Sequence, residues 1–295
     1  MKFGVILCAL ALTVTLGQAQ RHKLGDVNAE KPEGQLMQQI LQEADAAKKT
    51  ALMEQFATQF AKHSDYPAIL EQLLGVYVKA GNADKIVETA QQLLAIDPDD
   101  TEASLQALKA IEPRKDPAQI KKWSAATAAS ARKAIATPQP KEADEVEHWK
   151  NAVDYARQVN AYTDYALYRA ALEAADPKVK IDLAETLQQH NPQSEYNKQL
   201  QSPLFMAYRQ AGAGDKAVAL AEKVLATDQS NEDMLIVVAD DYMQKKKDPE
   251  KVHAYSAKVV EVLTAKPKPQ GVSDADWQNR NNLMMGLAHY MSGTT

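Results

Sequence analysis

Residues 67–98 constrain the fold of this chain more than any other stretch, because two apolar stripes of helical period flank a short polar turn. The first stripe ends at Tyr77, and the second begins at Ile86 with the same period of three to four residues. Gly81 interrupts the pattern between them, as a helix-ending residue does. Neither helix can bury its stripe alone, so the two must pack on each other and on neighbouring pairs. The sequence therefore predicts an all-α fold of stacked antiparallel helix pairs.

The same pattern recurs further along the chain. Tyr208 and Tyr242 each end another first stripe, and Gly212 follows Tyr208 as Gly81 follows Tyr77. An equal interval separates the end of a first stripe from the close of a second one in three places: Tyr77 to Pro98, Ala171 to Pro192, and Tyr208 to Gln229. Such regular recurrence indicates a repeat protein.

The unit resembles a tetratricopeptide repeat (TPR). The family has Trp, Leu-Gly and Tyr in its first helix, then Ala, Phe and Pro, and the matching positions here hold Leu70, Leu73 with Leu74, Tyr77, Ile86, Ala90 and Pro98. Leu74 departs from the pattern, since the family has Gly there. The resemblance implies antiparallel helix pairs stacked as a right-handed TPR-like α-solenoid, with about four recognisable repeats.

Pattern changes along the chain suggest its organisation. We expect a signal peptide over residues 1–19, a flexible segment over 20–34, TPR-like pairs over 35–100, irregular helical pairs over 101–160, TPR-like repeats over 161–264, and a loop with the first helix of a truncated repeat over 265–295. An alternative is a break between two sub-solenoids at Pro138–Pro140, because proline-rich stretches often mark domain boundaries.

The N-terminus has the pattern of a secretory signal peptide. Lys2 precedes an apolar run, and Ala19 closes a group of small residues suited to cleavage before Gln20. The alternative is an uncleaved membrane anchor, but the run is shorter than the roughly 20 residues that span a bilayer. We therefore predict a periplasmic or secreted protein without a membrane span after cleavage. Cys8 is the only cysteine, so the mature chain has no disulfide.

Composition and motifs narrow the function classes. The formal charge of −5 and the pI of about 5.7 argue against nucleic acid as the main partner. We find no metalloprotease, nucleophile-elbow, phosphate-loop or dinucleotide motif. The six histidines are never three or four positions apart, so no metal site is predicted. We predict no cofactor and no enzyme activity.

The TPR resemblance places the binding residues in the concave groove, on the first helices of successive repeats. Carried over by spacing, the groove-lining positions are Tyr162, Tyr165, Arg169, Met206, Arg209, Ile236 and Met243. Tyr, Arg and Met are enriched at protein interfaces. The alternative for Tyr162 and Tyr165 is packing against the neighbouring pair alone. Some family members clamp the terminal carboxylate of a partner with Lys and Asn side chains in the groove. The first clamp position in successive repeats of this chain holds Glu71, Tyr165, Ser202 and Ile236, which does not favour that binding mode.

The predicted function is a non-enzymatic exported TPR scaffold for protein–protein interactions in the cell envelope, with a partner peptide or helix in the groove. The alternative is a fragment of an envelope enzyme or carbohydrate-binding protein whose active part is missing. After Met285-Gly286 and Tyr290, no second helix follows the last first helix. We therefore expect that the chain is a fragment, or that this helix docks on a partner or self-associates with a second copy.

Overall fold

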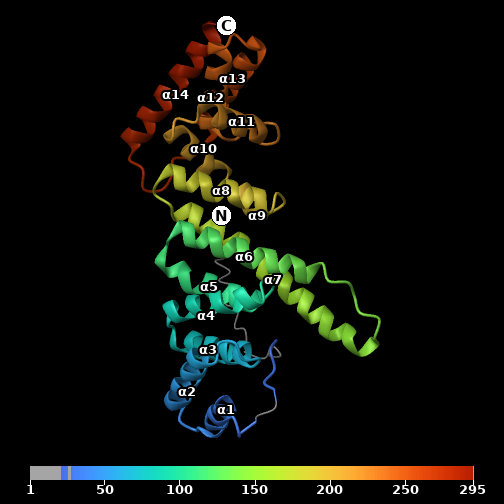
Figure 1. The fold of residues 1–295 in the computed structure, drawn as a ribbon. Helices are drawn as coiled ribbons and strands as arrows, with labels where there is room; N and C mark the ends of the chain where they lie inside the picture. The colour runs from blue at the N-terminus through green and yellow to red at the C-terminus, as the bar shows by residue number, and fades with distance from the viewer. Residues whose placement is uncertain (1–20, 26–27, 295) are drawn as a thin grey trace. The chain divides into compact units, whose positions relative to one another are not determined.

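The computed structural model describes residues 21–25 and 28–294, and these residues form helices, turns and coil without any strand. The predicted signal peptide and its cleavage before Gln20 lie outside the described residues. The chain divides into two compact units, residues 1–110 and residues 111–295 (Figure 1). Each unit is described by itself.

The first unit consists of helices that pack in sequence. α1 packs on α2, α2 on α3, and α3 on α4. A turn of only two residues, Gly81 and Asn82, joins α3 to α4, and the side chain of Asn82 caps α4 by accepting from the Lys85 N–H at 3.2 Å. Such a short connection makes the pair antiparallel, as predicted. The helices are α1 (Pro32–Gln42), α2 (Ala46–Gln59), α3 (Tyr66–Ala80), α4 (Ala83–Ile96) and α5 (Thr101–Ile111).

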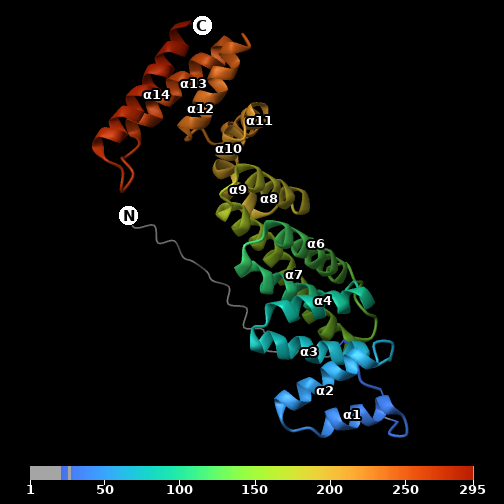
Figure 2. The same ribbon diagram turned by 60° about the vertical axis from the view of Figure 1, so that its left-hand side comes forward.

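The second unit continues this sequential packing from α6 to α14 (Figure 2). Asp116, Asp176 and Asp248 each cap a helix that has Pro at its first position, as their sequence pattern predicts. The elements are a short 3₁₀ turn (Glu112–Arg114), α6 (Pro117–Ile135), α7 (Ala143–Glu173), α8 (Pro177–His190), α9 (Glu195–Gln199), α10 (Gln201–Gln210), α11 (Gly214–Leu225), α12 (Glu232–Gln244), α13 (Pro249–Ala265) and α14 (Asp274–Thr294). The prediction of an all-α fold of stacked helix pairs is thus confirmed within each unit.

The alternative of a break at Pro138–Pro140 is wrong. This stretch joins α6 to α7, which pack along each other within the second unit. The Trp149 indole N–H donates to the Thr137 carbonyl at 2.9 Å and ties the start of α7 to the end of α6. The prolines therefore form a turn between two paired helices, and the units divide between Ala110 and Ile111 instead.

Some element bounds differ from those expected. α7 is one helix of 31 residues across the expected boundary at Asn160, because no Gly or Pro interrupts the chain there. α1 begins at Pro32 rather than at residue 35, since Pro is well suited to the first helical position. α14 continues through Ser292 and Gly293 to Thr294.

Tyr77, Tyr208 and Tyr242 hold the same position in three helix pairs, and we call them the repeat tyrosines. In each pair, the residue four positions after the repeat tyrosine has a left-handed backbone conformation. This residue is Gly81 (φ 65°), Gly212 (φ 72°) or Lys246 (φ 51°). Only the third is not a glycine, so it lacks the conformational freedom that favours glycine there. The next N–H donates back to the tyrosine carbonyl in each turn: Asn82 to Tyr77 at 3.0 Å, Ala213 to Tyr208 at 2.8 Å, and Lys247 to Tyr242 at 2.8 Å.

The repeat tyrosines also join neighbouring pairs. Each hydroxyl donates to a glutamate on the second helix of the preceding pair: Tyr77 to Glu54 of α2 at 2.6 Å, Tyr208 to Glu185 of α8 at 2.8 Å, and Tyr242 to Glu222 of α11 at 2.5 Å. A lysine of the following turn or helix lies over each ring, Lys85 at 6.0 Å, Lys216 at 5.5 Å and Lys247 at 4.2 Å from the centroid. Burial and the Glu185 carboxylate raise the pKa of Tyr208, so its hydroxyl stays a donor at neutral pH.

Candidate protein-binding surfaces

All seven predicted groove residues lie in the second unit, on three helices. Arg169, Met206 and Arg209 are exposed, and the other four are half-buried. α7 carries Tyr162, Tyr165 and Arg169, α10 carries Met206 and Arg209, and α12 carries Ile236 and Met243. Their role as a binding site stays a prediction, and the contacts around them define two separate surfaces.

The first surface is a tyrosine ladder made of Tyr162, Tyr165, Tyr168 and Tyr196. The ring centroids of Tyr162 and Tyr165 lie 6.3 Å apart, and those of Tyr165 and Tyr196 lie 6.0 Å apart. Tyr168 stacks on Tyr196 at 4.7 Å. Sequence reasoning missed Tyr196 as a site residue, because α9 is a short helix outside the repeat pattern. The i, i+3 spacing of Tyr165 and Tyr168 was the only available signal for Tyr168.

Charged groups flank the ladder. The Arg169 guanidinium lies 5.8 Å from the centre of the Tyr165 ring and pairs with Glu173 at 2.8 Å. Lys115 also pairs with Glu173, at 3.1 Å, and together these cations lower the pKa of the Glu173 carboxyl. At the other end, the Tyr162 hydroxyl donates to Glu112.

This arrangement suits recognition of a protein surface. Aromatic rings offer large apolar faces, and their hydroxyl groups can form hydrogen bonds at the edge of a contact. An arginine beside them adds a planar cation that can stack or bind a carboxylate. Burial and the neighbouring Glu112 raise the pKa of Tyr162, which fits the packing interpretation for that residue. Tyr165, between two rings and a guanidinium, is the centre of the ladder.

The second surface lies on α12 and α14. Three large apolar side chains of α14 are exposed: Leu283 at 66%, Leu287 at 44% and Tyr290 at 61%. We call these three residues the α14 strip. The adjacent side of the helix, about 100° around its axis, is buried through Met284, Ala288 and Met291. Sequence reasoning placed α14 but missed this strip, because helical periodicity does not say which of two apolar sides is covered.

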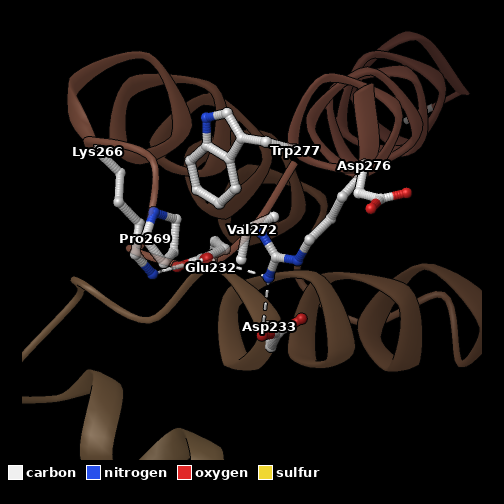
Figure 3. Close-up of a pocket in the computed structure, with 8 residues that line it drawn as sticks. Glu232, Asp233, Lys266, Pro269, Val272, Asp276 and Trp277 are labelled. Atoms are coloured by element: carbon white, nitrogen blue, oxygen red, sulfur yellow. Dashed lines mark hydrogen bonds and ion pairs between the residues drawn. The ribbon is translucent and has the colours of Figure 1, made fainter. Parts of the chain in front are cut away.

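A buried carboxylate fixes α14 to α12 and α13 (Figure 3). Glu232, at the start of α12, is only 2% exposed. Lys266, at the end of α13, donates to both of its carboxylate oxygens at 2.8 Å, and Arg280 of α14 donates at 3.0 Å. Arg280 also reaches Asp233 at 3.0 Å. Although burial opposes ionisation, the hydrogen bonds from these cations dominate and lower the pKa of Glu232.

The same group lines a small pocket of about 380 Å³, with Pro269, Val272, Asp276 and Trp277 as its other walls. Its two cations are already paired with Glu232 and Asp233, and the remaining charged residue of its lining is the carboxylate of Asp276, so the pocket offers no unpaired cation to an anionic ligand. Over the residues that the structure describes, no three His, Cys, Asp or Glu side chains gather where they could hold a metal ion. None of the helices there has the length and hydropathy of a membrane span.

In the first unit, an extended segment lies against the first helix of a pair. The His22 ring pairs with Glu71 at 2.7 Å, and the His22 backbone N–H donates to the same carboxylate at 3.2 Å. The Gly25 N–H donates to Asp65 at 2.8 Å, and Arg21 pairs with Asp97. Residues 21–25 are therefore held by specific contacts, although the sequence suggested a flexible segment. Glu71 is the position that spacing assigned to the groove.

No protein-family model matches the chain, and no curated protein matches it. Among solved structures, the TPR domain of P58(IPK) is similar over 88% of this chain and 66% of that one, just under two thirds, with 12% identity and a TM-score of 0.32. A computationally designed self-assembling cyclic homooligomer is similar over 88% of this chain and 89% of its own, with 11% identity and a TM-score of 0.24. At such TM-scores neither similarity bears on what the chain binds. The helix pairs themselves give the chain its resemblance to tetratricopeptide repeats.

Proposed function

We propose that the chain is a non-enzymatic scaffold that binds a protein or peptide partner on the first helices of its repeats. The tyrosine ladder with Arg169 carries this proposal, because it places four aromatic rings and a guanidinium at one accessible surface. Tyrosine and arginine are, with tryptophan, the residue types enriched among those that dominate binding energy at interfaces. Tyr168 and Tyr196 also pack against the hydrophobic core of the second unit, and so hold the accessible side chains of Tyr165 and Arg169 in place.

The contacts of residues 21–25 support the proposal from the first unit. A carboxylate on α3 holds both a side chain and a backbone N–H of an extended segment. A partner peptide on a first helix could be held by the same two kinds of contact. The chemistry at Glu71 suits an extended segment with a basic side chain.

The proposed setting is the cell envelope. The apolar run behind Lys2 and the small residues before Gln20 support export to the periplasm or secretion. Because no cysteine follows Cys8, the exported chain would form no disulfide in an oxidising compartment. Processing can be tested by the mass of the secreted protein, which should begin at Gln20.

Site-specific photo-crosslinking tests the binding surface. A photo-reactive phenylalanine analogue at Tyr165 should form an adduct with a partner in envelope extract. The matched control places the same analogue at Tyr255, a half-buried tyrosine of α13 outside the ladder. Adducts at both positions, or at Tyr255 alone, would remove the ladder as the binding surface.

Affinity provides the second test once the crosslinked partner is identified. Arg169→Ala and Tyr165→Ala should each weaken binding by about 1–3 kcal/mol, the range of interface residues that carry binding energy. Both side chains are at least partly accessible, so the helix content measured by circular dichroism should be unchanged. Unchanged affinity in both variants would contradict the proposal.

A further inference from the structure

The α14 strip belongs to a longer stripe on one side of its helix. Arg280, Leu283, Leu287, Tyr290 and Thr294 follow one another at intervals of three or four residues, so they share one side. Both ends of this stripe contact α12. Arg280 pairs with Asp233 at 3.0 Å, and the Thr294 hydroxyl lies 3.3 Å from the Met243 sulfur. The strip between these contacts therefore runs alongside α12.

The facing side of α12 is also partly open. Asp233, Ile236, Asp240 and Met243 recur at the same intervals, and all four are half-buried rather than buried. α12 and α14 run side by side in both views of the ribbon (Figures 1 and 2). Because the contacts at Arg280 and Thr294 follow the order of Asp233 and Met243, the two helices are parallel. Apolar side chains of both helices, Ile236 and Met243 of α12 and the α14 strip, therefore lie along one partly exposed surface.

One carboxylate in this surface, Asp240, forms no ion pair with a Lys or Arg of the described residues 21–25 and 28–294. Asp240 accepts a hydrogen bond from the Gln244 amide at 2.7 Å. Its neighbours differ, because Asp233 pairs with Arg280 and Asp241 pairs with Lys245 at 2.7 Å. A half-buried carboxylate with only an amide partner favours a cation that arrives with a ligand. The charge of Asp240 therefore specifies the ligand that covers the strip.

We propose that the α14 strip and the facing side of α12 bind an amphipathic helix of a partner protein. The helix presents apolar residues one turn apart to Leu283, Leu287 and Tyr290, and a Lys or Arg to Asp240. This inference rests on the proposed scaffold function and adds a partner class and a second surface to it. A second copy of this chain is a poorer occupant, because its own α14 carries no Lys or Arg after Arg280 to meet Asp240.

A panel of labelled helical peptides tests this inference on the full chain by fluorescence anisotropy. Each peptide has leucines at i, i+4, i+7 and i+11, and a single lysine that moves along the flank from one peptide to the next. We expect at least one peptide to bind, and Leu287→Asp to weaken it by about tenfold or more. Leu41→Asp is the matched control, since the exposure of Leu41 (53%) is similar to that of Leu287 (44%) but Leu41 lies in the first unit. It should leave the affinity unchanged.

A charge exchange tests the role of Asp240. Asp240→Lys should weaken the lysine peptide and should strengthen the peptide in which glutamate replaces that lysine. Three results would overturn the inference: no binding by any peptide below about 1 mM, equal binding of a scrambled peptide, or a dimer in sedimentation that only Leu287→Asp dissociates. The last result would assign the strip to a second copy. The crosslink at Tyr165 is read separately, because the absence of an adduct there would contradict the tyrosine ladder as a binding surface and would not bear on the α14 strip.

Discussion

We expect the carboxylate of Glu232 to stabilise the packing of α14 against α12 and α13. Glu232→Gln keeps the size of the side chain and removes its charge. The change affects three hydrogen bonds, two from Lys266 at 2.8 Å and one from Arg280 at 3.0 Å. These contacts join the start of α12 to the end of α13 and the first turns of α14.

The expected loss follows from the exposure of the partners. Removing one member of a buried ion pair costs about 3–5 kcal/mol, because a buried charge is left unpaired. Here the side chains of Lys266 and Arg280 are 41% and 36% exposed, so water can reach them. Arg280 also keeps Asp233. We therefore expect a smaller loss, about 2 kcal/mol, similar to that of one hydrogen bond to a charged group.

Hydrogen exchange measured by mass spectrometry shows where the loss occurs. Repeat proteins can open locally, so a single free energy of unfolding for the chain would not isolate the effect. Amides of α14 should exchange faster in Glu232→Gln, whereas those of α3 and α4 should not. Glu250→Gln is the matched control, since Glu250 is an exposed glutamate in the first turn of the neighbouring helix.

The pH dependence gives the same test without a mutation. The pKa of Glu232 is lowered in the folded state, so its contribution is complete above the unfolded value of about 4.3 and is lost as the pH falls through the folded value. Protection of α14 should therefore fall below about pH 4. Protection in Glu232→Gln equal to that in the parent chain, or a loss spread over both units, would refute this reasoning.

Three further predictions concern the repeats of the second unit. Lys246→Gly should raise the free energy of unfolding by about 1 kcal/mol by relieving a left-handed backbone, whereas Gly212→Ala should lower it by a similar amount, and urea denaturation measures both. Tyr208→Phe should lower the free energy of unfolding by about 1 kcal/mol in the same assay, because it removes the hydrogen bond to Glu185. An unchanged value would show that this hydrogen bond does not stabilise the fold. Burial lowers the pKa of His190, so this residue stabilises the unit fully above pH about 6.5 and less as the pH falls; the urea midpoint should drop between pH 7.5 and 5.5, and drop less in His190→Gln.

Much of the fold could be predicted because its signals are local. Helical periodicity, the capping residue Asp116 and the turn glycine Gly212 each act within one or two helical turns. The proline stretch 138–140 left a break between sub-solenoids open as an alternative for the same reason. Proline ends a helix, but the packing of α6 on α7 decides whether the next helix belongs to the same unit.

The sites depended on contacts between distant residues and were less predictable. Spacing placed Tyr165 and Arg169 on one face of α7, but the tyrosine ladder also needs Tyr196, which the fold brings from α9. The pairing of Glu232 with Lys266 and Arg280 spans 34 and 48 positions and leaves no periodic trace. The exposure of Leu287 likewise follows from how α14 packs, which its own sequence does not determine.

The contact between each repeat tyrosine and the preceding glutamate has a consequence for how such an array can lengthen. The donor lies on one pair and the acceptor on the pair before it, as with Tyr242 and Glu222. A tandem duplication of the 34 residues from one repeat tyrosine to the next would carry both halves of the contact. Each new junction would then re-form the same bond, as Tyr208 does with Glu185. Gene duplication could therefore extend this chain without evolving a new interface.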